Sequence, residues 1–233
     1  MRLMECNTPH LLSDFFSGFF EPFEAQKDPL FKKLFSCSAP FESLKALPSF
    51  FEELEKSKRS FYLSEEAHIS PKAHLVNPDL ITIEKGVTVE AFAQIEGPCY
   101  IGKNVHIGHS ALVRPYTVLL EGATVGHSSE VKASIFLPYA KAAHFNYVGD
   151  SFLGQKVNLG AGAILSNVRL DRKKICIKIE GVLIPTNLNK LGAILADKSQ
   201  VGCNATLNPG AVIGKGVFVY PNTVISGTLL ETL

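Results

Sequence analysis

The 233-residue chain carries 23 Lys and Arg against 22 Asp and Glu, a formal net charge of +1, and 46% of its residues are hydrophobic. This balance is typical of a globular protein, and the lack of a long basic run excludes a charge-driven nucleic-acid surface. No apolar run reaches the ~18–20 residues that a membrane-spanning helix needs. Five scattered cysteines without a C-x-x-C pair argue against a disulfide framework or a zinc site, and we expect no metal. Residues 1–10 lack the apolar core of a secretion signal, which predicts a cytoplasmic protein.

The first 61 residues differ from the rest in composition, since they hold eleven of the sixteen phenylalanines. Three sites each precede an apolar and charged segment in the manner of a helix start with an early proline: Thr8-Pro9, Asp28-Pro29 and Leu47-Pro48-Ser49. Phenylalanine doublets recur at helical spacing and give apolar faces too wide for a helix alone in water. We therefore expect residues 1–61 to form a helical cap or wrap that covers one end of the following domain; a patch for docking a partner protein is the alternative.

From residue 62 onward the dominant feature is a repeat of six residues. An aliphatic side chain returns at every sixth position in three runs: Ile83 to Leu137, Leu153 to Leu165, and Leu195 to Ile225. Such a unit is too short for a helical repeat, whereas three units close one triangular coil of three short parallel strands. Coils of this kind stack at the ~4.8 Å strand spacing with their aliphatic side chains inward. The sequence thus predicts a mainly β fold over residues 62–233, a single-stranded parallel β-helix of hexapeptide repeats with an N-terminal helical cap.

Two segments interrupt the repeat. After Leu137 the count slips, and we expect residues 141–150 to leave the coil as a short loop. A longer segment, about 166–192, alternates around Glu180-Gly181, which predicts a hairpin inserted into the β-helix. Because functional residues concentrate on loops held by a rigid scaffold, we expect the site near these interruptions.

Four motifs resemble, in the same order, the acetyltransferase half of bifunctional N-acetylglucosamine-1-phosphate uridyltransferase/glucosamine-1-phosphate acetyltransferase. They are Arg114-Pro-Tyr, Val131-Lys132-Ala, His144-Phe-Asn-Tyr147-Val-Gly-Asp150 and Asn158-Leu-Gly-Ala161-Gly. The hairpin and the run that begins at Lys190 are also similar to the β-helical C-terminal domains of sugar-1-phosphate nucleotidylyltransferases. The resemblance covers residues 80–228 and implies left-handed coils. The nucleotidyltransferase domain of both families has no counterpart in residues 1–61, which argues against uridylyl transfer.

The resemblance implies specific roles for individual residues. His144 matches the general base, and the ordinary pKa of histidine, ~6.5, suits that task. The residues that match substrate-binding positions are Arg114, Lys132, Tyr147, Asn158 and Lys190. The residues that match positions lining the acetyl-CoA groove are Ala161, whose backbone N–H would face the thioester carbonyl, Cys203 and Tyr220. At Ser166-Asn167 the chain keeps an asparagine of the family pattern and lacks the tyrosine that follows it.

We therefore expect an N-acetyltransferase that moves an acetyl group from acetyl-CoA to an aminosugar 1-phosphate, in particular glucosamine 1-phosphate. This reaction belongs to sugar-nucleotide and cell-envelope precursor synthesis, and enzymes of this fold work as homotrimers. One alternative is a related acyltransferase with another amine or hydroxyl acceptor, because fold does not fix function. A second is a non-catalytic trimeric β-helix that serves as a regulatory or scaffold subunit of a separate sugar nucleotidyltransferase. The bulk of Tyr220, which could block the coenzyme A groove, favours this second alternative.

Overall fold

The computed structural model describes residues 8–57, 59 and 62–232. Cys6 and the rest of residues 1–7 therefore lie outside the described residues, as do residues 60–61 at the predicted domain boundary. The described N-terminal region holds three α-helices and a short 3-10 helix: α1 (Thr8–Phe16), η1 (Glu24–Lys27), α2 (Pro29–Leu34) and α3 (Pro40–Lys56). None of the described helices is long and apolar enough to cross a membrane.

The predicted helix start at Asp28-Pro29 is confirmed, because the Asp28 carboxylate accepts a hydrogen bond from Leu30 N–H at 3.0 Å. The start predicted at Leu47-Pro48-Ser49 is wrong. Helix α3 begins earlier, at Pro40, and Pro48 lies inside it. Proline fits the first turn of a helix, and at Pro40 the side chain of Glu42 adds a hydrogen bond, since it accepts from the Ala39 N–H at 3.2 Å.

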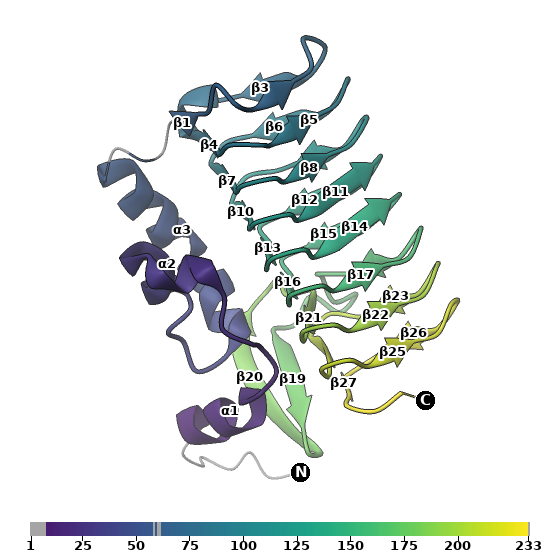
Figure 1. The fold of residues 1–233 in the computed structure, drawn as a ribbon. Helices are drawn as coiled ribbons and strands as arrows, with labels where there is room; N and C mark the ends of the chain where they lie inside the picture. The colour runs from purple at the N-terminus through teal and green to yellow at the C-terminus, as the bar shows by residue number, and fades with distance from the viewer. Residues whose placement is uncertain (1–7, 58, 60–61, 233) are drawn as a thin grey trace.

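The rest of the described chain winds into a left-handed parallel β-helix (Figure 1), as expected from the repeat and the resemblance. Each coil gives one short strand to each of three parallel sheets, which we call sheets A, B and C in chain order. Sheet A consists of β1 (Tyr62–Leu63), β4 (Ile81–Ile83), β7 (Cys99–Ile101), β10 (Thr117–Leu119), β13 (Ile135–Phe136), β16 (Phe152–Leu153), β21 (Ala193–Leu195), β24 (Ala211–Ile213) and β27 (Thr228–Leu229).

Sheet B consists of β2 (His68–Ile69), β5 (Thr88–Val89), β8 (His106–Ile107), β11 (Thr124–His127), β14 (Lys141–His144), β17 (Asn158–Leu159), β22 (Gln200–Val201) and β25 (Phe218–Val219). Sheet C consists of β3 (His74–Val76), β6 (Gln94–Glu96), β9 (Leu112–Val113), β12 (Glu130–Lys132), β15 (Tyr147–Gly149), β18 (Ile164–Leu165), β23 (Thr206–Leu207) and β26 (Val224–Ile225). A short 3-10 helix, η2 (Pro78–Leu80), leads from β3 to β4.

The six-residue positions form the axial core, with one shift of phase. From Ile83 to Val131 the repeated aliphatic side chains are buried together along the axis. At the next position the prediction is wrong, because Phe136 lies in this core and Leu137 packs outside it, against the N-terminal helices. The reason is a corner between sheets C and A that is one residue shorter at Ala133, where φ is 45°.

The prediction that residues 141–150 leave the coil as a loop is wrong. They form β14 and β15, which pair in register with the strands of the preceding coil. The slip in the count has a simpler origin, a second shortened corner at Asp150, where φ is 47°. The segment that carries His144 and Tyr147 is therefore part of the rigid stack.

The N-terminal helices cover a side of the β-helix rather than its end (Figure 1). They pack with the outward apolar side chains of sheet A in one buried cluster. Phe31 contacts Tyr100 with ring centroids 4.9 Å apart, and Phe20 contacts Phe152 at 5.1 Å. Sheet A needs this cover because its strands are apolar on both faces, whereas the outer faces of sheets B and C carry polar side chains.

The inserted hairpin extends the same cover. Its strands are β19 (Ile175–Ile179) and β20 (Val182–Leu188), an antiparallel pair joined at Glu180-Gly181, where both φ values are positive. Ile177 and Ile184 are buried in the cluster that joins the helices to sheet A. The hairpin leaves after β18 and returns at β21, so it occupies the corner between sheets C and A.

A buried carboxylate ties the N-terminal segment to the coils. Asp197 accepts hydrogen bonds from the backbone N–H groups of Glu21, at 2.6 Å, and Gln155, at 2.7 Å. Burial raises the pKa of Asp197, and these two N–H donors oppose that rise. At the surface, Lys198 and Lys215 form ion pairs of 2.8 and 3.1 Å with the Glu21 carboxylate.

Replacing Asp197 with alanine is expected to lower the free energy of unfolding by about 1–3 kcal/mol, because it leaves two part-buried N–H groups without an acceptor. Urea denaturation measures this loss. The matched control is Lys198→Ala, which removes an exposed ion pair to the same segment and is expected to cost less than about 1 kcal/mol. An equal effect of the two substitutions would show that the carboxylate does not secure the segment.

Candidate active site

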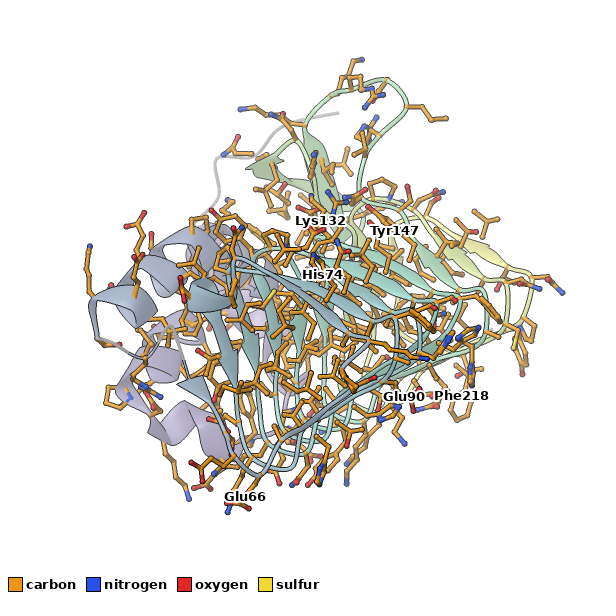
Figure 2. All side chains as sticks on the ribbon, turned by 90° about the horizontal axis from the view of Figure 1, so that it is seen from above. Glu66, His74, Glu90, Lys132, Tyr147 and Phe218 are labelled. Carbon is orange, nitrogen blue, oxygen red and sulfur yellow. The ribbon has the colours of Figure 1, made fainter. Side chains whose placement is uncertain are left out.

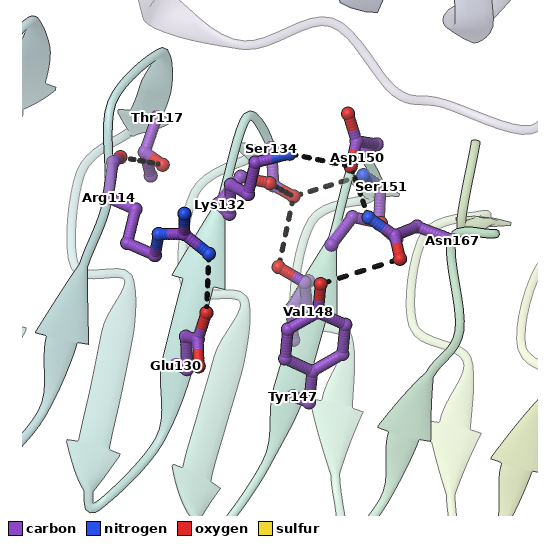
Figure 3. Close-up of polar contacts among 11 residues, drawn as sticks. Arg114, Thr117, Glu130, Lys132, Ser134, Tyr147, Val148, Asp150, Ser151 and Asn167 are labelled. Carbon is purple, nitrogen blue, oxygen red and sulfur yellow. Dashed lines mark hydrogen bonds and ion pairs between the residues drawn. The ribbon is translucent and has the colours of Figure 1, made fainter. Parts of the chain in front are cut away.

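The outer face of sheet C carries two cations on adjacent coils. Arg114 follows β9 and its backbone N–H donates to Val131 O, which places it beside Lys132 of β12. Arg114 Nη1 lies 2.9 Å from Glu130 Oε1, and Lys132 Nζ lies 3.3 Å from Asp150 Oδ2 (Figure 3). Both cations are partly exposed and held by a carboxylate, so an incoming anion can contact them by replacing a carboxylate partner.

The four charged residues Arg114, Glu130, Lys132 and Asp150 form a cluster that we call the polar group. Tyr147 and Asn167 extend it onto the next coils. The Tyr147 hydroxyl donates to Asn167 Oδ1 at 3.4 Å, and Asn167 Nδ2 donates to the Asp150 carboxylate (Figure 3). Burial, together with the charges of Glu130 and Asp150, raises the pKa of Tyr147. The phenol therefore stays protonated near neutral pH and acts as a hydrogen-bond donor, not as a base.

The corner beneath these side chains is fixed by buried serines. Ser134 Oγ donates to Lys132 O at 2.8 Å and accepts from Ser151 N–H at 3.0 Å. Ser151 Oγ in turn accepts from Ala193 N–H at 3.0 Å. These hydroxyls link successive coils across the shortened corners, so the backbone that carries Lys132 and Asp150 is held rigidly.

Lys190 lies at the base of the inserted hairpin, next to this polar group. Leu191 N–H donates to Asn167 O at 3.0 Å, and Gly192 N–H donates to Asp150 O at 2.8 Å, so the chain returns from its excursion beside both residues. The Lys190 side chain is exposed. The structure thus brings four of the five predicted substrate residues to one edge of sheet C.

His144 lies at the other edge of sheet C, at the corner with sheet B. It pairs in register with His127 of the preceding coil, its side chain is exposed, and its imidazole has no hydrogen-bond partner among the described residues. Above it, the rings of His109 and His127 lie 5.4 Å apart, and His127 contacts Phe145 at 5.1 Å. The imidazole of His144 is open to solvent and accessible to a ligand.

The predicted acetyl-CoA residues follow the same corner toward the C-terminus. Gly162 N–H donates to His144 O at 3.0 Å, which places Ala161 one coil below His144. Asn204 N–H donates to Ala161 O at 2.9 Å, which places Cys203 one coil further. Cys203 is exposed, and so is Tyr220, with 55% of its surface accessible. The three side chains therefore belong to one edge of the prism.

Asn158 is set apart from the other predicted substrate residues. It belongs to β17 of sheet B, paired with Lys141 and Gln200, and is half-buried. The view from above (Figure 2) shows Lys132 and Tyr147 on one side of the prism. Within one chain Asn158 and those residues lie on different faces.

Three residues of the polar group were not predicted as site residues: Glu130, Asp150 and Asn167. The spacing carried part of the signal, because Arg114 and Lys132 are separated by three six-residue units, which is one coil. Asp150 follows Lys132 at the same interval of 18 residues, and Asn167 follows Asp150 at the shorter interval of 17.

Within the part of the chain that the structure describes, no group of three His, Cys, Asp or Glu side chains could hold a metal ion. The four described cysteines, Cys37, Cys99, Cys176 and Cys203, are free thiols.

Residues 81–115 match the model of the bacterial transferase hexapeptide (six repeats) family. A bifunctional sugar-1-phosphate nucleotidylyltransferase/acetyltransferase of Sulfurisphaera tokodaii is 38% identical over 154 residues, which cover 64% of this chain and 38% of that protein. The bifunctional protein GlmU of Methanocaldococcus jannaschii is 39% identical over 118 residues, which cover 51% of this chain and 29% of that protein.

Among solved structures, a UDP-N-acetylglucosamine acyltransferase of Francisella novicida matches with a TM-score of 0.47 and 13% identity, over 71% of this chain and 61% of that one. The chain spans less than two fifths of the length of either sequence relative. The sequence comparisons confirm the predicted resemblance. The chain contains a hexapeptide-repeat domain and is homologous to bifunctional sugar-1-phosphate nucleotidylyltransferase/acetyltransferases and GlmU proteins.

Proposed function

We propose that the protein transfers an acetyl group from acetyl-CoA to the amine of an aminosugar 1-phosphate, with glucosamine 1-phosphate as the first candidate. The observation that carries the proposal is the layout of sheet C. Arg114, Lys132 and the hydroxyl of Tyr147 gather at one edge of its outer face, and the exposed His144 lies at the other. The names of the sequence relatives, which include sugar-1-phosphate and acetyltransferase, support the same chemistry.

In the proposed reaction Arg114 and Lys132 bind the phosphate, because both can donate charge-assisted hydrogen bonds to its oxygens. Tyr147 donates to an oxygen of the sugar. The sugar lies across the outer face of sheet C, and its amine is directed toward the corner that carries His144. Lys190, at the base of the hairpin beside the proposed phosphate site, adds a further positive charge.

His144 then accepts a proton from the attacking amine as nitrogen bonds to the acetyl carbon. The carbonyl oxygen gains negative charge, which the backbone N–H of Ala161 stabilises by a hydrogen bond. The C–S bond breaks, the amide forms, and the proton held by His144 passes to the departing thiolate of coenzyme A. Cys203 and Tyr220, further along the same corner, contact the coenzyme.

The proposal includes a homotrimer. Helices α2 and α3 and the hairpin cover sheet A, whereas the outer faces of sheets B and C are free for contacts between copies in the proposed trimer. Asn158 lies on a different face from Arg114 and Lys132 of its own chain, and in a trimer it can contribute to the substrate site of a neighbouring copy. Light scattering of the purified protein measures the oligomeric state, and a monomer would contradict this part of the proposal.

The direct test is to incubate the protein with acetyl-CoA and glucosamine 1-phosphate and to measure thiol release together with the N-acetylated product. Other amino sugars and hydroxyl acceptors serve as comparison substrates and identify a different acceptor if one is preferred. Calorimetry with acetyl-CoA separates the remaining alternative. Binding of sugar phosphate without binding or turnover of acetyl-CoA would favour a regulatory subunit of a separate nucleotidyltransferase.

Replacing Lys132 with methionine is expected to raise the KM for the sugar phosphate about 10–100-fold, because one charge-assisted hydrogen bond to the phosphate is lost. The effect on kcat is expected to be small, since the contact is present in both ground and transition states. Initial rates over a range of sugar phosphate concentration measure the change. Lys156→Met, at an exposed corner away from sheet C, is the control and should leave KM unchanged. An unaltered KM in Lys132→Met would remove this residue from the phosphate site.

A further inference from the structure

Asn146 occupies a buried position that four other coils fill with alanine, while Ser129 and Thr223 fill it in two more. The carbonyl groups of Ala93, Ala111, Ala163 and Ala205 each accept the backbone hydrogen bond that begins sheet C in their coil, and the carbonyl of Asn146 does the same. All of these residues are buried, and Asn146 is 3% exposed. Alanine therefore suffices to close this corner. A buried amide there is costly unless each of its polar atoms is hydrogen-bonded.

The Asn146 side chain is fully hydrogen-bonded, and its partners belong to the candidate site. Its Oδ1 accepts from the backbone N–H of His144 at 3.1 Å. Its Nδ2 donates to Gly160 O at 2.8 Å and to Ala163 O at 3.3 Å, both in the turn of the next coil. One side chain thus connects the turn that carries His144 with the turn that carries Ala161.

Two hydrogen bonds to Gly160 O, from Asn146 Nδ2 at 2.8 Å and from Ala163 N–H at 3.2 Å, fix the direction of the Ala161 N–H. The two groups belong to the same planar trans peptide unit, so they point in opposite directions. With the carbonyl held by Asn146, the N–H is directed away from it, and this N–H has no acceptor among the described residues. Gly160 allows the turn to approach the coil below, because a Cβ there would lie 2.6 Å from Cys203 N.

We propose that Asn146 is a positioning residue for acyl transfer. It holds the His144 backbone and the Ala161 N–H in a fixed relation, so that the proton acceptor is aligned with the attacking amine while the oxyanion donor faces the thioester carbonyl. This inference rests on the proposed function, and it adds a residue that touches neither substrate. Asn146 contributes to turnover rather than to binding, because its effect is on the alignment of groups that act in the transition state.

The test compares Asn146→Ala with the wild-type enzyme. We expect kcat to fall about 10–100-fold while KM for both substrates stays within about twofold. The corner should still close, as it does at Ala163, and a melting curve checks this. Asn146→Asp is the second variant. It keeps an acceptor for the His144 N–H and loses the donor to Gly160 O, so its kcat should fall at least as far.

Ser43→Ala is the matched control, because it removes a buried hydroxyl that donates to Leu34 O at 2.8 Å in the N-terminal helices. It is expected to lower stability to a similar degree without changing kcat. Hydrogen exchange of the peptide that spans residues 158–165 gives a second readout and should be faster in Asn146→Ala alone.

The outcomes separate the two hypotheses. An inactive wild-type protein would overturn the proposed function and this inference with it. An active wild type whose Asn146→Ala variant turns over at the same rate would overturn the inference alone. A fall in kcat equal to that of Ser43→Ala would also overturn it, since the loss would then follow general stability.

Discussion

Replacing His144 with alanine is expected to lower the kcat of acetyl transfer about 10²–10⁴-fold. The attacking amine would lose its proton acceptor, and no other imidazole takes that place at the corner between sheets B and C in this coil. The fold should be unaffected, because the side chain is exposed and has no hydrogen-bond partner among the described residues. Steady-state kinetics with acetyl-CoA and glucosamine 1-phosphate, beside a thermal melt, measures both quantities.

The chain offers a matched control one coil above. His127 occupies the same corner, is also exposed, and pairs in register with His144. His127→Ala should therefore keep kcat within about twofold of the wild type. Full activity of His144→Ala, or an equal loss in both variants, would contradict the assignment of His144 as the general base.

Replacing Phe31 with alanine is expected to lower the free energy of unfolding by about 3–5 kcal/mol. Its ring is 2% exposed and contacts Phe50 of α3 at 5.1 Å and Tyr100 of sheet A at 4.9 Å, so its removal opens a cavity between the helices and the β-helix. Guanidinium denaturation followed by circular dichroism measures the loss. A separate early transition would mean that the helices detach before the coils unfold.

Phe92→Ala controls for the loss of an aromatic ring as such. Phe92 is 59% exposed and its ring contacts His109 at the surface, so the expected cost is below about 1 kcal/mol. If Phe31→Ala cost no more than Phe92→Ala, the helical layer would contribute little to the stability of the β-helix.

The coil stack could be predicted from sequence because each inward position repeats independently of its neighbours. The exact phase could not, since Phe136 and Leu137 are adjacent and both apolar, and a shortened corner exchanges their roles. The side on which the helices lie is nevertheless indicated in the sequence. Strands such as Cys99-Tyr100-Ile101 are apolar at every position, which indicates cover on both faces.

The candidate site could be predicted in part. A separation of 18 residues is one coil of three six-residue units, so the repeat is sufficient to place Arg114 and Lys132 on neighbouring coils, as observed. The same spacing places Asp150, 18 residues after Lys132, on the next coil, whereas Glu130 lies 16 residues after Arg114 and could not be found in this way. Asp150 is a corner residue in a left-handed conformation, and its contacts depend on a turn whose length the repeat does not reveal. For Asn158 the motif was misleading within one chain. The resemblance placed it among the substrate residues, whereas its strand belongs to sheet B and lies on another face.

The bond between Glu21 and Asp197 joins positions 176 residues apart in the chain. At a synthesis rate of about 5–20 residues per second, the N-terminal segment leaves the ribosome roughly 10–35 s before its acceptor does. For much of that interval its phenylalanines lack the surface on which they finally pack, since Phe31 needs Tyr100 and Phe20 needs Phe152. Expression of this protein should accordingly depend on chaperones that shield nascent apolar chains, and aggregation during synthesis should begin at the N-terminus.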